Sequence, residues 1–181
     1  MLLAGVRVDA VTEGTLQGLL GVGENRSLDF KRDQYGNGLA ARKEFAADVS
    51  ALANTIGGHL ILGIAEENGL AVEVTGVELD NVDAERVRLE QIARTGIQPR
   101  IMGLRIEPVP LANGRHAIVI EVPESFSRPH RVVIEGSNRF WARAGGGKYE
   151  PDVLELGALY SQGPSTAEKS PRLSPRKDSS D

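Results

Sequence analysis

The chain has 181 residues, of which 40% are hydrophobic and 25% are charged, so it is long enough to bury one hydrophobic core. It contains no cysteine and only three scattered histidines, which excludes disulfides, thiol catalysis and thiolate metal sites. The formal net charge of -4 excludes a uniformly basic domain, so a site for nucleic acid must be a local patch.

The sequence divides into a folded part and a tail. No run of about 18 apolar residues and no signal-peptide pattern is present, so we expect a cytoplasmic protein without a membrane span. Residues 1–161 are expected to form one domain. Residues 162–181 are rich in serine, proline and charges with little to bury, which predicts a disordered tail.

In chain order, the first expected element is a short helix over 12–20 with Thr12 as its N-cap. A strand over 27–31 follows, in which Leu28 and Phe30 point to one side and Asp29 and Lys31 to the other. The glycine-containing segment 33–38 then leads as a loop into the next helix.

Residues 43–64 are the centre of the predicted fold. The apolar residues from Phe45 to Ala53 recur at helical spacing, which predicts a helix over 40–54 with Asp48 and Ser50 facing away from the core. The Gly57-Gly58 pair predicts a left-handed helix end. The apolar run over 60–64 predicts a central strand buried on both faces, with polar side chains emerging over 63–69.

The rest of the chain alternates helices and antiparallel strands. We expect a turn at 67–69, a returning strand over 70–74, and a helix from 82 to about 95 that Asp80 or Asn81 caps. Strands over 101–109 and 116–122 form a hairpin, and a helix over 151–160 closes the domain. This order predicts an α+β fold, with a mixed or antiparallel sheet and helices packed mainly on one face.

Three acids could converge at one end of the central strand: Glu24, Asp29, and Glu66 or its neighbour Glu67. If strand 27–31 pairs beside the central strand, their oxygens could hold Mg²⁺ or Mn²⁺, and Lys31 could stabilise charge on a phosphate during metal-assisted phosphodiester cleavage. The alternative is a solvated strand edge with ordinary surface charges. Spacing alone favours this alternative, because no compact metal motif is present.

The two halves of the chain differ in charge. Residues 66–90 carry eight acids, whereas residues 125–148 are basic. Arginines beside Trp141 are suited to contact phosphates and stack on bases of nucleic acid, whereas a buried tryptophan with solvated arginines is the alternative. The basic side chains in question are Arg128, Arg131, Arg139 and Arg143. His59 is expected to be a hydrogen-bonded core histidine, and no phosphate-binding loop motif supports nucleotide binding.

Three motifs in these regions resemble the AlbA-like domain of the Schlafen family over about residues 12–152. Residues 24–31, with Glu24 and the run Leu-Asp-Phe-Lys, resemble E-x-x-x-[LVI]-E-[FL]-K. Residues 51–58 and 62–64 resemble A-F-A-N-T-x-G-G followed by I-G-V, and residues 140–145 resemble the late Y-x-R-x-G element. Asp29 stands where the family has glutamate, and Ala65 occupies the first of two positions that are commonly acidic.

The resemblance implies an α+β nucleic-acid-binding domain. Some animal members are metal-dependent endoribonucleases that act on structured RNA such as transfer RNA, which implies Glu24, Asp29 and Glu66 as ligands of Mg²⁺ or Mn²⁺, with Lys31 beside them. We therefore expect an RNA-binding protein in which Lys31 and the four arginines contact phosphates, with endoribonuclease activity as a further expectation.

Two other functions remain open, namely a non-catalytic protein-interaction module and an ATP-binding protein. The animal relatives carry two such lobes in one chain, so a homodimer is expected to rebuild their shared groove.

Overall fold

The computed structural model describes residues 7–162, so all but the first residue of the predicted tail lies outside the described part. The main sheet has the strand order β1-β2-β7-β6, made of β1 (Leu28–Lys31), β2 (Gly58–Leu62), β7 (His116–Val122) and β6 (Arg105–Pro110). β1 is parallel to β2, and the other neighbours are antiparallel. The predicted α+β class with a mixed sheet is confirmed.

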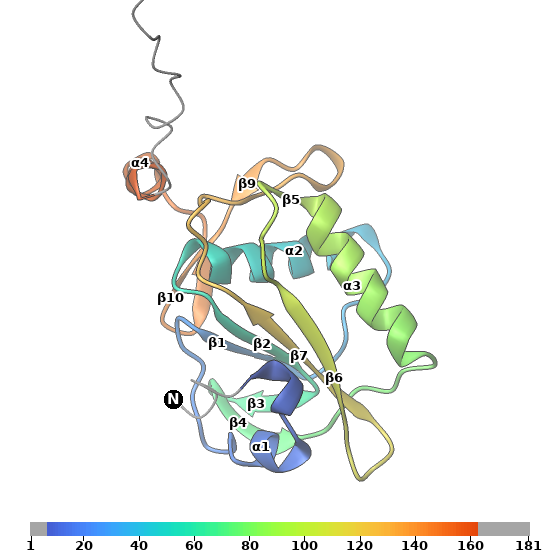
Figure 1. The fold of residues 1–181 in the computed structure, drawn as a ribbon. Helices are drawn as coiled ribbons and strands as arrows, with labels where there is room; N and C mark the ends of the chain where they lie inside the picture. Colours follow the sequence, from blue (N-terminus) through green and yellow to red (C-terminus); the bar gives the residue numbers. More distant parts are fainter. Residues whose placement is uncertain (1–6, 163–181) are drawn as a thin grey trace, which may run out of the picture.

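Two long helices cover one face of this sheet, α2 (Leu39–Asn54) and α3 (Val82–Gly96) (Figure 1). Phe45 and Leu52 of α2 and Leu89 of α3 pack with Leu60 in one buried cluster. Of the two predicted caps of α3, the structure selects Asn81, whose side chain accepts a hydrogen bond from the amide of Ala84 at 2.9 Å.

Smaller elements cover the opposite face. They are the 3₁₀ helix η1 (Val8–Ala10), the helix α1 (Glu13–Gln17) and the hairpin of β3 (Ile64–Glu67) and β4 (Leu70–Val74). They enclose a second cluster with Leu16, Phe30 and Ile61. Thr12 is the N-cap of α1, as predicted, but the helix ends at Gln17, before the predicted residue 20, in keeping with the poor helix propensity of Gly18.

The glycines at the start of β2 allow close contact with Ser27, which precedes β1, and with residues 122–124. Gly57 and Gly58 have φ values of +70° and +138°, and a Cβ on Gly58 would lie 2.0 Å from the carbonyl oxygen of Ser27. The predicted left-handed break is confirmed. β2 is buried on both faces, as expected, but it ends at Leu62, because Gly63 turns the chain into the separate β3–β4 hairpin.

The C-terminal part forms small sheets beside α2. β5 (Ile97–Gln98), β8 (Arg131–Val132) and β9 (Arg139–Phe140) make a three-stranded sheet, with the 3₁₀ helix η2 (Ile134–Gly136) between β8 and β9. β10 (Ala142–Ala144) pairs with β11 (Gly147–Tyr149). β6 begins four residues later than the predicted strand, since 102–103 form a turn.

The last helix, α4 (Val153–Ser161), does not close the domain as predicted. None of its residues is buried, and Val153 and Leu154 are 82% and 83% exposed. In Figure 1, α4 lies at the edge of the molecule, away from the main sheet. Among the described residues, no helix combines the length and apolar character needed to cross a membrane.

Candidate functional site

Asp29 and Arg143 form a buried ion pair next to the main sheet. They are 2% and 3% exposed, and the guanidinium places Nη1 3.2 Å from Oδ2 and Nη2 3.3 Å from Oδ1 of the carboxylate. Lys31 Nζ lies 3.2 Å from the same Oδ2. Burial alone would raise the pKa of Asp29, but the hydrogen bond with Glu24 and the two cations lower it below its usual value.

Glu24 lies beside this pair. Its Oε1 accepts a hydrogen bond from the amide of Phe30 at 2.8 Å, and its side chain also hydrogen-bonds Asp29. Burial and that hydrogen bond raise the pKa of Glu24 to about 7. Near neutral pH, Glu24 therefore carries a proton in part of the molecules and can donate it to Asp29.

Asp48 of α2 extends the cluster toward the β10–β11 hairpin. Its carboxylate accepts hydrogen bonds from Tyr35 at 2.5 Å and from Lys148 at 2.7 Å, and Lys31 Nζ lies 4.0 Å away. Asp48 and Ser50 were predicted to face away from the core, which is wrong, since both are buried. We call Asp29, Lys31, Asp48, Arg143 and Lys148 the buried charge network, which ties β1, α2 and the hairpin together.

Glu66 is not part of this network. Its Oε2 accepts a hydrogen bond from the amide of Gly69 at 2.6 Å within the β3–β4 turn, although Glu24, Lys31 and Glu66 line one open groove of about 380 Å³. Both oxygens of Asp29 face Arg143 or Lys31, and within residues 7–162 no three acidic or histidine side chains are grouped to hold a metal ion. As arranged here the three acids do not fit Mg²⁺ or Mn²⁺, and the metal site stays a prediction.

The four predicted phosphate-binding arginines lie in different surroundings. Arg143 faces Asp29 in the interior, so its expected role at a surface phosphate is wrong for this structure. Arg139 is exposed and paired with Glu150 at 2.6 Å. Trp141 is half-buried, with Lys148 Nζ 5.7 Å from its ring centroid, and it lines a smaller pocket with Arg139.

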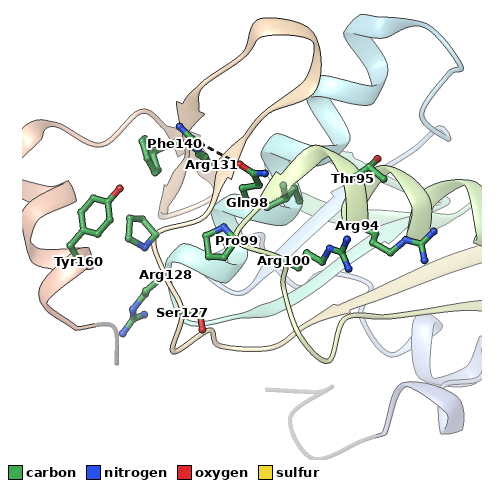
Figure 2. A pocket seen from close by; sticks show the side chains of 12 residues that line it. Arg94, Thr95, Gln98, Pro99, Arg100, Ser127, Arg128, Arg131, Phe140 and Tyr160 are labelled. Atoms are coloured by element: carbon green, nitrogen blue, oxygen red, sulfur yellow. Dashed lines mark hydrogen bonds between the residues drawn. The ribbon is translucent and has the colours of Figure 1, made fainter. Parts of the chain in front are cut away.

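The other two arginines share an open cleft of about 1140 Å³, shown in Figure 2. Its polar lining comes mainly from arginine side chains of α3, of β8, of the loop after β5 and of the loop before β8, and β9 and α4 add aromatic rings. We call the following residues the basic cleft: Arg94, Arg100, Arg128, Arg131, Phe140 and Tyr160. In Figure 2, Phe140 and Tyr160 lie at one end, and Arg94 and Arg100 lie at the other with Pro99 between.

Three arginines of the basic cleft lack an acidic partner. Among the described residues, Arg94, Arg100 and Arg131 make no ion pair; Arg94 and Arg131 donate instead to the neutral side chains of Gln91 and Gln98. Arg128 donates to the carbonyl oxygen of Thr55 at 2.7 Å and lies 3.6 Å from Glu124. Within residues 7–162, the cleft therefore presents three positive charges that no carboxylate pairs. Arg94 and Arg100 were not predicted from the sequence, because they lie about 25 to 31 residues before the basic segment 125–148.

His130 joins the two loops that form the floor of the basic cleft. It is completely buried, with Nδ1 2.7 Å from the carbonyl oxygen of Pro99 and Nε2 2.6 Å from Ser125 Oγ. A carbonyl can only accept, so Nδ1 carries the proton and Nε2 accepts from the serine hydroxyl. Burial lowers the pKa of His130, which favours this neutral form.

Asn54, the last residue of α2, fixes the backbone of His130. Its Oδ1 accepts from the amide of His130 at 2.6 Å, and its Nδ2 donates to the carbonyl oxygens of His130 and Trp141, each at 2.8 Å. His59 behaves differently from the expected hydrogen-bonded core histidine. It is buried, but its ring nitrogens have no hydrogen-bond partner among the residues that the structure describes.

The residues of the buried charge network and the arginines of the basic cleft lie within one stretch of the chain that matches a known family. Residues 24–152 match the sequence profile described as Schlafen, AlbA_2. The chain belongs to the Schlafen AlbA_2 family. No curated protein sequence matches it.

Two solved structures resemble this Schlafen AlbA_2 domain. The DIP2311 protein from Corynebacterium diphtheriae is 25% identical with a TM-score of 0.52, over 77% of this chain and 24% of that one, so the chain spans about a quarter of that protein. The N-terminal domain of a protein from Nitrosomonas europaea, named for its relation to the ATP-dependent DNA helicase RecG, is 21% identical with a TM-score of 0.51, over 77% of this chain and 91% of that one. The latter likeness concerns the fold alone.

The family-like motifs hold the Schlafen AlbA_2 fold together in this chain. Asp29 of the first motif pairs with Arg143 of the third, and Asn54 of the second fixes the loop of His130. Gly57 and Gly58 admit β1 and the 122–124 segment at distances that a side chain would block. Through Asn54 and His130 the second motif helps to hold the loops under the basic cleft, although all four arginines of the cleft lie outside the three motifs.

Proposed function

We propose that this Schlafen AlbA_2 domain binds nucleic acid, with RNA as the main ligand, in the basic cleft. The observation that carries the proposal is the gathering of Arg94, Arg100 and Arg131, each without a carboxylate partner among residues 7–162, around one cleft with two aromatic rings. Guanidinium groups bind phosphates in bidentate fashion, and rings can stack on bases. A chain of net charge -4 needs such a local patch to attract a polyanion.

RNA is preferred over DNA in this proposal because of the resemblance to the animal endoribonucleases of the family. The Nitrosomonas protein is named for a DNA helicase, so DNA of the same sequence is the necessary comparison. Binding of RNA or DNA at low salt separates this proposal from the two alternative functions. A protein-interaction module or an ATP-binding protein should bind neither RNA nor DNA, even at low salt.

The test measures binding of a labelled single-stranded RNA and of transfer RNA by fluorescence anisotropy at several salt concentrations. The cleft variant removes three charges that have no acidic partner: Arg94→Gln, Arg100→Gln and Arg131→Gln. The control variant removes three exposed charges outside the cleft, each already paired with an acid: Arg86→Gln, Arg105→Gln and Arg115→Gln. Both variants change the net charge equally.

Wild-type affinity should fall steeply between about 50 and 200 mM salt because phosphate contacts release counterions. In the cleft variant, the slope of log affinity against log salt should become shallower by about 2, since each single-strand phosphate contact contributes about 0.7. The control variant should keep the wild-type slope. Equal slopes in the cleft and control variants, or no binding by the wild type at low salt, would overturn the proposal.

Metal-dependent RNA cleavage and a homodimer stay predictions of the family resemblance. Cleavage through Glu24, Asp29 and Glu66 requires a rearrangement, because Arg143 now occupies the position beside Asp29 and Glu66 caps its own turn. A homodimer would present a second basic cleft to one RNA. Light scattering of the purified chain tests it, and a monomer at tens of micromolar would argue against a dimer of about micromolar affinity.

A further inference from the structure

We infer that the basic cleft binds an unpaired strand, one base of which is clamped between Phe140 of β9 and Tyr160 of α4. The inference rests on the proposed function and deepens it by naming the form of nucleic acid that the cleft selects. It places the phosphates of the neighbouring nucleotides on the arginines and the base on the rings.

The two rings meet edge to face at the end of the cleft. Their centroids are 6.5 Å apart with an interplanar angle of 70°, and Tyr160 is 62% exposed. An edge contact leaves ring faces uncovered, and a base can stack on such a face whatever its identity, because every base has a π surface. In Figure 2 the rings lie across the cleft from Arg94 and Arg100.

The two rings are held with different firmness. Phe140 belongs to β9, which is paired with β8 in the three-stranded sheet. None of the nine residues of α4 is fully buried, although Leu156 and Leu159 are half-buried. Beyond the helix's own N-terminal cap, the ring contact and one hydrogen bond, from Tyr149 OH to Glu155 at 2.9 Å, are its polar and aromatic contacts with the rest of residues 7–162. Phe140 thus provides a fixed platform, and Tyr160 can move aside to admit a base without disturbing either hydrophobic cluster.

The same arrangement disfavours a duplex. Bases in a duplex are already stacked on one another and paired, so presenting one to the rings requires its unpairing. A single strand has exposed bases and can place phosphates on Arg94, Arg100 and Arg131 at the same time. The cleft should therefore prefer single strands, loops or frayed ends over continuous helix.

The experiment compares a short RNA strand carrying 2-aminopurine with the same strand annealed to its complement. The wild type should bind the single strand about tenfold more tightly than the duplex and should quench 2-aminopurine fluorescence on binding. Tyr160→Ala and Phe140→Ala should each weaken single-strand binding about tenfold, the effect of losing one stacked base, and should abolish the quenching.

Two variants serve as controls. Tyr160→Phe keeps the ring and should keep both affinity and quenching. Leu154→Ala alters an apolar residue of α4 that is even more exposed than Tyr160 and does not line the cleft, and it should behave as the wild type. Because Tyr160 is largely exposed, its replacement should leave the fold intact, which circular dichroism checks.

The outcomes separate this inference from the proposed function. Equal affinity for strand and duplex, together with unchanged binding and quenching in Tyr160→Ala, would overturn the base clamp while leaving arginine-dependent binding in place. No binding of either RNA by the wild type would overturn the proposed function and the clamp together.

Discussion

Replacing Arg143 with methionine tests whether the buried charge network is a main support of the fold. Methionine keeps most of the side-chain volume but removes the guanidinium, which places two nitrogens 3.2 Å and 3.3 Å from the oxygens of Asp29. The carboxylate would then keep Lys31 at 3.2 Å and the hydrogen bond with Glu24.

The size of the effect follows from burial. The side chains of Arg143 and Asp29 are 1% and 3% exposed, so water cannot replace the lost contacts. Removing one partner of a buried ion pair typically costs about 3–5 kcal/mol, and the remaining Lys31 contact favours the lower end, about 3 kcal/mol. For a domain of this size, that corresponds to a fall in melting temperature of roughly 10 °C.

Urea unfolding followed by far-UV circular dichroism measures this loss. Arg139→Met is the matched control, because Arg139 and Glu150 form an exposed pair whose loss should cost less than about 1 kcal/mol. Adding Asp29→Asn to Arg143→Met should recover part of the stability, since it removes the charge of a buried carboxylate that has lost one of its two cations and keeps only Lys31. A loss in Arg143→Met no larger than that in Arg139→Met would refute the reasoning.

Three further predictions concern single groups. The pKa of Glu24 is raised to about 7 in the folded state, so the stability of the wild type should fall as pH rises from about 4.5 to 7. Glu24→Gln should therefore be more stable than the wild type above pH 7, and this difference should vanish toward pH 4.5. A difference in urea unfolding that does not depend on pH would contradict this. His130→Gln should lower the free energy of unfolding by about 2 kcal/mol or more, because two buried hydrogen bonds are lost. It should also weaken RNA binding, because the loops under the cleft are no longer joined. Unchanged RNA affinity in the folded variant would argue against this positioning role of His130. Cleavage of transfer RNA by the wild type with Mn²⁺ through the predicted acids should be absent in Glu66→Ala and in Asp29→Asn, whereas RNA binding should remain. Cleavage that persists in both variants, or no cleavage by the wild type, would contradict the predicted site.

The sequence predicted the main elements well where the local signal is strong. β7 coincides with the predicted strand over 116–122, and α3 begins at the predicted residue and ends one residue beyond the predicted end. The turn at 67–69 and the break at Gly57-Gly58 were also predicted, because few residues besides glycine and asparagine adopt a positive φ.

The buried charge network could not be predicted from the sequence. Asp29 and Arg143 are 114 residues apart, and each is assigned to a solvent-exposed position when it is considered alone. Asp48 was placed on the outer face of α2, because a charged residue is rarely buried without a partner and its partner Lys148 comes from a distant hairpin. Such pairs become visible only when the elements are placed in space.

The basic cleft was found in part. Arg128 and Arg131 were predicted, but Arg94 and Arg100 come from the end of α3 and the loop after β5, which fold back beside β8. Conversely, the helix predicted over 151–160 is present over 153–161, but its exposed position was not predicted. A hydrophobic pattern shows that a segment can form an apolar surface, not what that surface contacts.

The most direct test of the account is to map bound RNA onto the chain by NMR chemical-shift changes of the backbone amides. We predict that a single-stranded RNA shifts the amides of the non-proline residues of 94–100 and 127–131 and those of Phe140 and Tyr160, which surround the basic cleft, and leaves those around Glu66 and the β3–β4 turn unchanged. Shifts confined to the groove of Glu24 and Glu66, or spread evenly over the surface, would contradict the assignment of the basic cleft as the nucleic-acid site.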